Sequence, residues 1–433
     1  MHLTSIRTLI LSLLFPCLLH SQTTPTDNCG AAKYQLTQAL EKEDYSLAAH
    51  WFQRGLENCD TLTSSFLKNS SIAYSNLLRE EWEKQDKNLK HPRVIELSDT
   101  VDFIYSERLK LTDDPKWIES YASFLYFYRE GQRPKSDSLY QISIAHLKDD
   151  SRASSLRRHF RMSIIQAKSD GLSTETKELL FSKYLELSSY AIKGAEKAQN
   201  EKDRTSYMDA DNFLDRLMTI IVTDCHQLDT AINYKLSFIS DEKIKLKTIE
   251  RFILYYEDKD CTEADGYALL LDELSRSNPS VSTFITLGLA HYQKEKFQQA
   301  KEAFQKALNL SETEPDISNS HYHLGKTLKA LRQHKKAVAE LKKVTGPYKK
   351  DALVLIAKAI ALLQCGDSSF ERKAVYWLAN DYIQKAIRNG ATGLDPRMYM
   401  DKAPKREDVF NEGLKEGEPY EIKCWGESTI IRF

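Results

Sequence analysis

Residues 284–308 constrain the fold more than any other part of this 433-residue chain. They contain small and large apolar residues at helical spacing, namely Leu287, Gly288, Phe297, Ala300, Phe304 and Ala307. Apolar residues three or four positions apart lie on one side of a helix, which is then buried against a neighbour. The small residues let two helices approach closely, and the large ones fill the space beside them. The stretch therefore predicts an antiparallel pair of helices.

This spacing is typical of the tetratricopeptide repeat, a pair of antiparallel helices about 34 residues long. His291 stands where that repeat usually has a tyrosine. Equivalent positions recur along the chain and mark repeats or hairpins at residues 29–59, 117–148, 281–314, 318–351 and 349–389. Stacked repeats of this kind build binding surfaces rather than catalytic centres.

The remaining segments also show apolar residues at helical spacing. No proline occurs between Pro134 and Pro279, and this long stretch is rich in helix-forming residues. Further helices are predicted at residues 71–84, 93–110, 152–168, 175–198, 206–224, 226–238, 241–257 and 264–276. The predicted fold class is therefore all-α, a tetratricopeptide-like solenoid of helical hairpins with a short, partly extended, non-repeat C-terminal tail. The expected divisions are a signal peptide at 1–21, an N-terminal helical repeat region at 22–205, a C-terminal tetratricopeptide repeat region at 206–395 and the tail at 396–433.

The character of the sequence changes after Gly390, where glycine and proline become frequent. Polar and apolar residues alternate on both sides of Gly426, which predicts a short hairpin or an extended tail. We expect the tail to cover the apolar end of the last helical hairpin, because solenoids need polar terminal caps. The residues available for that contact are Val409, Phe410, Tyr420, Ile422 and Trp425. A disordered tail is the alternative.

The N-terminus has the features of an export signal. Arg7 precedes an apolar run at residues 9–19 that is too short to span a bilayer. Cleavage after Ser21 would leave Gln22 first, and no other segment is apolar enough to cross a membrane. Two alternatives stay open: a buried N-terminal helix, and lipid attachment at Cys17, although the residue before Cys17 is not small. We expect an exported protein, periplasmic or associated with the cell envelope.

Removal of the signal would leave six cysteines, Cys29, Cys59, Cys225, Cys261, Cys365 and Cys424. An even number of cysteines in an exported chain indicates disulfides. Cys29 begins the first helix of the first repeat and Cys59 ends the second, so an antiparallel hairpin would bring them side by side. Cys225 and Cys261 occupy the same two places around the hairpin at 226–257, which predicts a second bond. A third bond, between the remaining two cysteines, requires the tail to fold back.

Four phrases of the sequence carry a resemblance to a known family. They are E-D-Y-S-L-A-A-H-W-F at residues 43–52, the pair Cys225 and Cys261, Y-W-L-A-N-D-Y-I-Q-K-A at 376–386, and the tail K-R-E-D-V-F-N-E-G-L-K-E-G-E-P-Y-E-I-K-C-W-G-E-S-T-I-I-R. With them the chain resembles exported tetratricopeptide-repeat proteins of the Bacteroidota type, although its segment after Trp425 is shorter than usual. The resemblance implies the architecture and export, and it implies no reaction.

No motif in the sequence predicts chemistry. The chain has no H-E-x-x-H, G-x-S-x-G, P-loop or G-x-G-x-x-G pattern. His321 and His323 would point to different sides of one helix, so we expect surface residues rather than a metal pair. Cys365 ends an apolar run, which favours a buried or disulfide-bonded residue over a nucleophile. We therefore predict no catalytic residue, no metal ligand and no cofactor, and the net charge of −1 indicates no nucleic acid partner.

The predicted function is that of an exported tetratricopeptide-repeat scaffold, which binds a protein or peptide on its concave face and is not an enzyme. The alternative is an envelope-associated component of glycan uptake, or another nutrient-binding component, with a similar helical frame. The candidate partner-binding residues lie on the first helices of the two best repeats, at Tyr292, Gln293, Tyr322, Lys326 and Lys329. Two tyrosines beside two lysines suit a peptide that carries an acidic group.

Overall fold

The computed structural model describes residues 28–433, in which nineteen α-helices and one small two-stranded sheet are present. The predicted signal peptide, its cleavage site and Cys17 lie outside the described residues. The helices form two compact units that divide between Asp170 and Gly171. Among residues 28–433, none of the helices has both the length and the apolar character needed to cross a bilayer. The all-α prediction of a solenoid of helical hairpins with a short extended element in the tail is confirmed.

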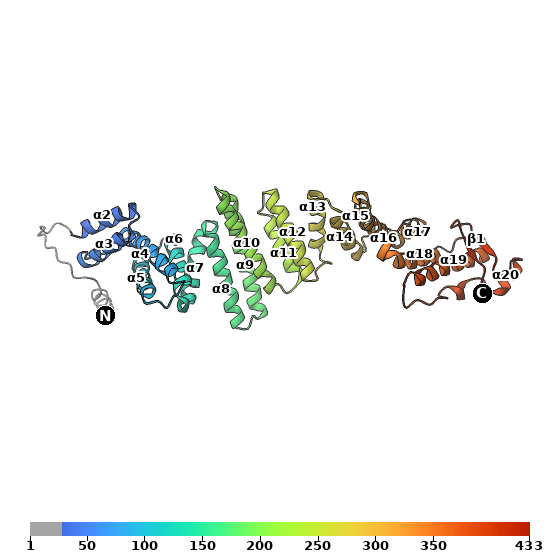
Figure 1. The fold of residues 1–433 in the computed structure, drawn as a ribbon, viewed down its shortest axis with the longest axis horizontal. Helices are drawn as coiled ribbons and strands as arrows, with labels where there is room; N and C mark the ends of the chain where they lie inside the picture. Colours follow the sequence, from blue (N-terminus) through green and yellow to red (C-terminus); the bar gives the residue numbers. More distant parts are fainter. Residues whose placement is uncertain (1–27) are drawn as a thin grey trace. The chain divides into compact units, whose positions relative to one another are not determined.

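The first unit consists of three helical hairpins and a seventh helix (Figure 1). Its helices are α2 Asn28–Glu41, α3 Tyr45–Asn58, α4 Ser64–Lys84, α5 Pro92–Leu109, α6 Pro115–Tyr128, α7 Arg133–Leu147 and α8 Ala153–Ser169, with short 3₁₀ turns at Glu130–Gln132 and Lys148–Asp150. The pairs α2 and α3, α4 and α5, and α6 and α7 pack against each other. Aromatic residues also join neighbouring pairs; for example, the rings of Tyr105 on α5 and Tyr121 on α6 stack with centroids 5.3 Å apart.

The second unit continues with hairpins and ends in the tail (Figure 1). Its elements are α9 Thr174–Lys197, α10 Glu201–Ile221, α11 Cys225–Leu236, α12 Glu242–Asp258, α13 Asp265–Ser277, α14 Val281–Gln293, α15 Phe297–Leu310, α16 Glu314–Ala330, α17 His334–Leu341, α18 Lys349–Leu363, α19 Ser369–Arg388, α20 Arg406–Asn411, β1 Pro419–Ile422 and β2 Glu427–Ile430, with 3₁₀ turns at Gly346–Tyr348 and Met400–Lys402. The boundary expected between residues 205 and 206 falls within α10.

Two glycines show why the repeat requires small residues. A Cβ atom added to Gly288 on α14 would lie 2.5 Å from the ring of Phe304 on α15. A Cβ atom added to Gly325 on α16 would lie 2.5 Å from the side chain of Leu341 on α17. Such distances are far below van der Waals contact, so larger residues would push the paired helices apart. The close approach inferred from the sequence is therefore present in both hairpins.

The turns between paired helices are also alike. Glu43, Glu295 and Arg332 each have a φ angle between 55° and 57°, in the left-handed region. In all three turns the N–H of the next residue donates to the carbonyl five residues earlier in the first helix. This bond satisfies a carbonyl at the helix end and reverses the chain direction. The recurrence of one turn keeps successive hairpins similar.

The cysteines lie in three pairs at disulfide distance. The Cα atoms are 4.9 Å apart for Cys29 and Cys59, and 5.5 Å apart for Cys225 and Cys261. Both pairs join the ends of a helical hairpin, as the sequence predicts. In the chain-entropy description, closing loops of this length stabilises a fold by about 3–4 kcal/mol. The remaining pair, Cys365 and Cys424, has a Cα separation of 6.1 Å and ties the tail to the loop between α18 and α19.

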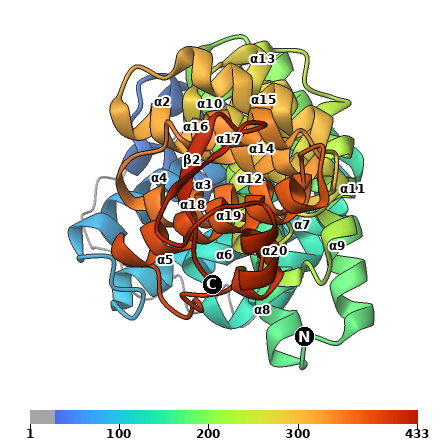
Figure 2. The same cartoon turned by 90° about the vertical axis from the view of Figure 1, so that its right-hand side faces the viewer.

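The tail folds back on α19, and Figure 2 shows this end of the unit with the tail in dark red. The two strands pair antiparallel, with Tyr420 opposite Thr429 and Ile422 opposite Glu427. Three tail side chains, Val409, Ile422 and Ile431, are almost fully buried in the core that α18 and α19 share. Tyr420 and Trp425 pack at its edge. Phe410, also expected to contribute, is instead 81% exposed, because the short helix α20 turns it away from the core that buries Val409.

Candidate partner-binding face

The predicted binding residues lie on the first helices of consecutive hairpins. These helices are α14, α16 and α18, and each contacts the next. The start of α14 is fixed by Ser280, whose hydroxyl accepts a hydrogen bond from the N–H of Thr283. The start of α16 is fixed in the same way by Thr313, with Pro315 in the first turn. Capping oxygens at these positions satisfy N–H groups that lack partners within the helix. The surface that these three helices share is called the A-helix face below.

An aromatic–cation pair joins the first two helices of this face. The Lys326 ammonium on α16 lies 4.6 Å from the ring centroid of Tyr292 on α14. Burial raises the pKa of Tyr292, so its hydroxyl is neutral at physiological pH. Cation–π contacts of this kind contribute about 0.5–2 kcal/mol, more where the cation is desolvated. The contact holds Lys326 beside the tyrosine ring.

A second aromatic contact extends the face toward α18. The ring of Tyr322 stacks on that of Tyr348, with centroids 4.7 Å apart and planes inclined by 19°. Burial raises the pKa of Tyr322, and the nearby carboxylate of Asp351 raises it further. Tyr322 is half-buried against Tyr348. It therefore presents only part of its ring to a partner.

Three lysines on this face lack carboxylate partners. They are Lys326 and Lys329 on α16 and Lys358 on α18, and within the described residues none of them forms an ion pair. Burial lowers the pKa of Lys329, and the positive charges of Lys358 and Lys326 lower it further. Like charges that are partly removed from water repel one another strongly. The A-helix face thus has an excess of positive charge that an anionic group would relieve.

Of the five predicted residues, the structure brings Tyr292 and Lys326 into contact, and it places Tyr322 close enough to Tyr292, and Lys329 close enough to Lys326, for an electrostatic effect on their pKa values. Gln293 ends α14, is exposed, and its side chain forms no hydrogen bond within residues 28–433.

Sequence reasoning missed Lys358. The sequence contains a pattern that could have identified it. Lys326 directly follows the small residue Gly325, and Lys358 directly follows the small residue Ala357 at the equivalent place in α18.

Two histidines beside this face do not have the exposed positions that the sequence indicated. His321 is 8% exposed, and its ring nitrogen is 2.7 Å from a carboxylate oxygen of Glu340 on α17. His323 lies between the helices, where its ring stacks on Phe304 with centroids 5.3 Å apart. The two rings do contact different neighbours, as helical geometry requires. The expectation of surface positions was wrong because this face of α16 packs against α15 and α17.

The pKa of His323 makes the free energy of unfolding depend on pH. Burial lowers the pKa of His323 to about 4, and Lys326 contributes to the shift. Between pH 6.5 and 4 the unfolded chain therefore binds more protons at this residue than the folded chain does. The contribution of His323 to the free energy of unfolding is fully present above pH 6.5 and is lost as the pH decreases through this window. We expect the melting temperature to fall less steeply over pH 6.5–4 in His323→Gln than in the unmodified protein.

The matched control is His226→Gln, because His226 is exposed on α11. Differential scanning calorimetry at several pH values would give, for each protein, the slope of melting temperature against pH. Equal slopes for His323→Gln and the unmodified protein would contradict the prediction.

The strongest cluster of ionisable groups lies elsewhere and is closed to solvent. The Lys235 ammonium on α11 is 2.7 Å from both carboxylate oxygens of Asp211 and 2.6 Å from Asp215, both on α10. Arg251 on α12 also pairs with Asp215, at 2.5 Å. Asp211, Asp215 and Lys235 are 0% exposed, so no substrate reaches them. This network joins neighbouring helices and is not a candidate active site.

Comparisons with known proteins agree with the repeat architecture. Two family models, both described as tetratricopeptide repeat, match residues 282–314 and 318–346. These are the two best repeats of the sequence and carry most of the A-helix face. No curated protein matches this chain significantly.

Three solved structures are similar to parts of the chain. A tetratricopeptide repeat protein from Parabacteroides merdae is 13% identical, covers 77% of this chain and 99% of its own length, and has a TM-score of 0.30. The TPR2AB-domain:pHSP90-complex of yeast Sti1 is 9% identical, with coverages of 83% and 98% and a TM-score of 0.24. The human IFIT1 dimer with m7Gppp-AAAA is 12% identical, with coverages of 90% and 83% and a TM-score of 0.27. Similarity this low carries no conclusion about ligands or partners.

Proposed function

We propose that this chain is an exported scaffold that holds a protein or peptide partner on the A-helix face and catalyses no reaction. The tetratricopeptide repeats support this role, because stacked helical hairpins present extended surfaces suited to protein binding. The partner carries an acidic group, and it contacts the tyrosines through its apolar or main-chain atoms. Membership of the Bacteroidota-type family with the K-R-E-D-V-F tail belongs to the same proposal.

The observation that carries the proposal is the uncompensated charge of three lysines beside two tyrosines. Lys358 and Lys326 lie close enough to Lys329 for their positive charges to lower its pKa. A bound carboxylate would remove this repulsion and would form charge-assisted hydrogen bonds in a partly desolvated setting. Tyr292 and Tyr322 offer rigid ring area beside that charge, at little cost in conformational entropy.

Export is supported by the cysteines. All three pairs lie at disulfide distance, and disulfides persist in oxidising compartments rather than in the cytosol. The apolar run at residues 9–19, with Arg7 before it, has the composition of a secretory signal. A periplasmic or envelope-associated scaffold combines both features.

The test is a crosslinking pull-down from intact cells with a triple variant, Tyr322→Ala/Lys326→Ala/Lys329→Ala. We expect the variant to fold, as judged by circular dichroism, and to lose at least 90% of the partner that the unmodified chain recovers. The matched control is Lys335→Ala/Lys336→Ala, which removes two exposed lysines from α17 in the same repeat. A folded triple variant that recovers every partner would place the binding site elsewhere.

A further inference from the structure

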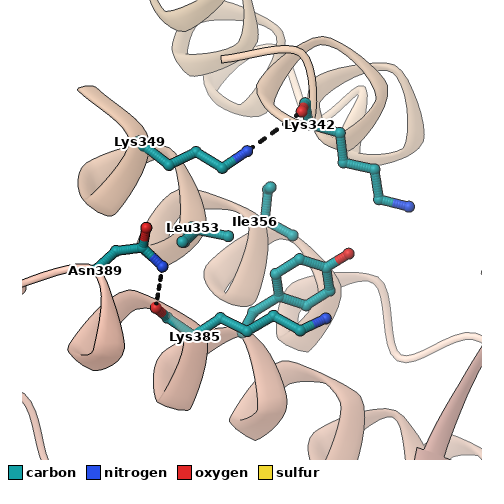
Figure 3. Close-up of a pocket in the computed structure, with 7 residues that line it drawn as sticks. Lys342, Lys349, Leu353, Ile356, Lys385 and Asn389 are labelled. Carbon is teal, nitrogen blue, oxygen red and sulfur yellow. Dashed lines mark hydrogen bonds between the residues drawn. The ribbon is translucent and has the colours of Figure 1, made fainter. Parts of the chain in front are cut away.

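A pocket lies between α18 and α19, beside the end of α17, and its lining residues differ from the tyrosines and lysines named on the A-helix face. Its volume is about 270 Å³, and Figure 3 shows its residues. Leu353 and Ile356 of α18 form an apolar floor, and Lys349 crosses above them toward the main-chain carbonyl of Lys342 (Figure 3). The full lining is Lys342, Lys349, Leu353, Ile356, Tyr382, Lys385 and Asn389.

The hydrogen bonds at this pocket satisfy only part of its polar groups. Lys342 pairs with the Glu427 carboxylate of β2 at 2.6 Å, and the Tyr382 hydroxyl donates to the same carboxylate at 2.7 Å. Lys349 donates only a long bond, 3.5 Å, to a main-chain carbonyl. The Lys385 ammonium lies 4.5 Å from the centroid of the Tyr382 ring. Glu427 of the tail therefore engages two of the lining side chains, Lys342 and Tyr382.

The charges at the pocket do not balance. Of the three lysines that line the pocket, Lys342 is paired with Glu427, so the positive charges of Lys349 and Lys385 are left uncompensated. Neither Lys349 nor Lys385 forms an ion pair with any residue in the described part of the chain. A ligand that carries two negative charges would match this excess.

We propose that the pocket binds a small organic phosphate monoester. Such a group carries about −1.5 to −2 charges at pH 7 and offers three acceptor oxygens. The free ammoniums of Lys349 on α18 and Lys385 on α19 can approach a tetrahedral group from two directions, whereas a planar carboxylate is better matched by arginine, which the pocket lacks. The exposed edges of Leu353 and the Tyr382 ring, each 5% exposed, provide a small apolar contact for the organic part of the ligand.

The experiment uses phenyl phosphate as the probe, with inorganic phosphate and benzoate as comparison compounds, in isothermal titration calorimetry of the full chain at low ionic strength. We expect saturable binding of phenyl phosphate, with at least a tenfold loss of affinity in Lys349→Gln and in Lys385→Gln. The matched controls are Lys350→Gln and Arg388→Gln, which remove the adjacent exposed charges of α18 and α19. These controls should change the affinity less than twofold.

Several outcomes would overturn the proposal. They are the absence of saturable binding, an equal loss in the control variants, and benzoate binding as tightly as phenyl phosphate. Inorganic phosphate binding as tightly as phenyl phosphate would indicate an adventitious ion only. Circular dichroism verifies folding, and charge reversal by Lys349→Glu provides a second variant that should abolish binding. The Tyr322→Ala/Lys326→Ala/Lys329→Ala variant should keep full affinity, which separates this site from the A-helix face.

Discussion

Replacement of Lys235 by methionine is expected to lower the stability of α9–α12 by about 3–5 kcal/mol, the cost of removing one partner from a buried ion network. Lys235 is 0% exposed and pairs with both Asp211 and Asp215, at 2.7 and 2.6 Å. Its loss would leave two buried carboxylates with Arg251 as the only cation of the network. Burial raises the pKa of Asp211, and the Asp215 carboxylate raises it further, so Asp211 would take up a proton or draw in water.

This loss of stability should be local at first, because the network joins a defined set of helices. Tyr184 and Ser188 of α9 donate to Asp215 and Asp211, at 2.6 and 2.7 Å. Hydrogen–deuterium exchange of peptides from α9 to α12 would report the free energy of opening in this region. Urea unfolding followed by circular dichroism would report its effect on the whole chain.

Two further variants make the test specific. Lys247→Met removes an exposed lysine from α12 and should change the free energy of opening, as measured by exchange, by less than about 0.5 kcal/mol. Lys235→Met/Asp211→Leu should recover at least half of the loss, because Asp215 keeps Arg251 as its partner. If Lys235→Met and Lys247→Met had the same effect on exchange, the network would not hold these helices together.

Replacement of Ile431 by alanine is expected to destabilise the last hairpin by about 2–5 kcal/mol, the usual range for a buried isoleucine. Ile431 is 1% exposed in the core between the tail and α19, whereas its neighbour Ile430 is 47% exposed. The tail is also held by the Trp377 indole, which donates to the carbonyl of Arg432 at 2.8 Å, and by Thr429, which donates to Asp381 at 2.6 Å. A loosened tail would expose the apolar faces of α18 and α19.

The adjacent residue supplies the control. Ile430→Ala removes the same atoms from the same part of the chain and should change the melting temperature little. Deletion of residues 396–433 should lower the melting temperature further than Ile431→Ala or make the protein insoluble. Thermal melts monitored by far-UV circular dichroism would compare the three proteins. An unchanged melt after the deletion would mean that the tail does not cap the last hairpin.

Local spacing in the sequence determined the hairpins. Gly288 and Gly325 can be recognised because close helix packing tolerates only small residues at their positions, and this requirement recurs with each repeat. The pairs Cys29–Cys59 and Cys225–Cys261 could be predicted by the same reasoning. The two ends of an antiparallel hairpin lie side by side, and this does not depend on the neighbouring hairpins. The tail hairpin could be predicted from the alternation around Gly426. In each case the decisive contact lies within one hairpin or between neighbouring residues.

Contacts between hairpins were decided only by the tertiary structure. Asp211 and Asp215 lie on the buried side of α10 among apolar residues, and nothing in the local sequence shows that Lys235 and Arg251 reach them from the next two helices. Lys358 joins the A-helix face, and Lys342 meets Glu427 of the tail, for the same reason. Charge pairing acts through space between chain segments that are far apart in sequence. The sequence by itself therefore determined each hairpin, and the packing of hairpins on one another and on the tail decided which charges are neutralised and which are left for a ligand.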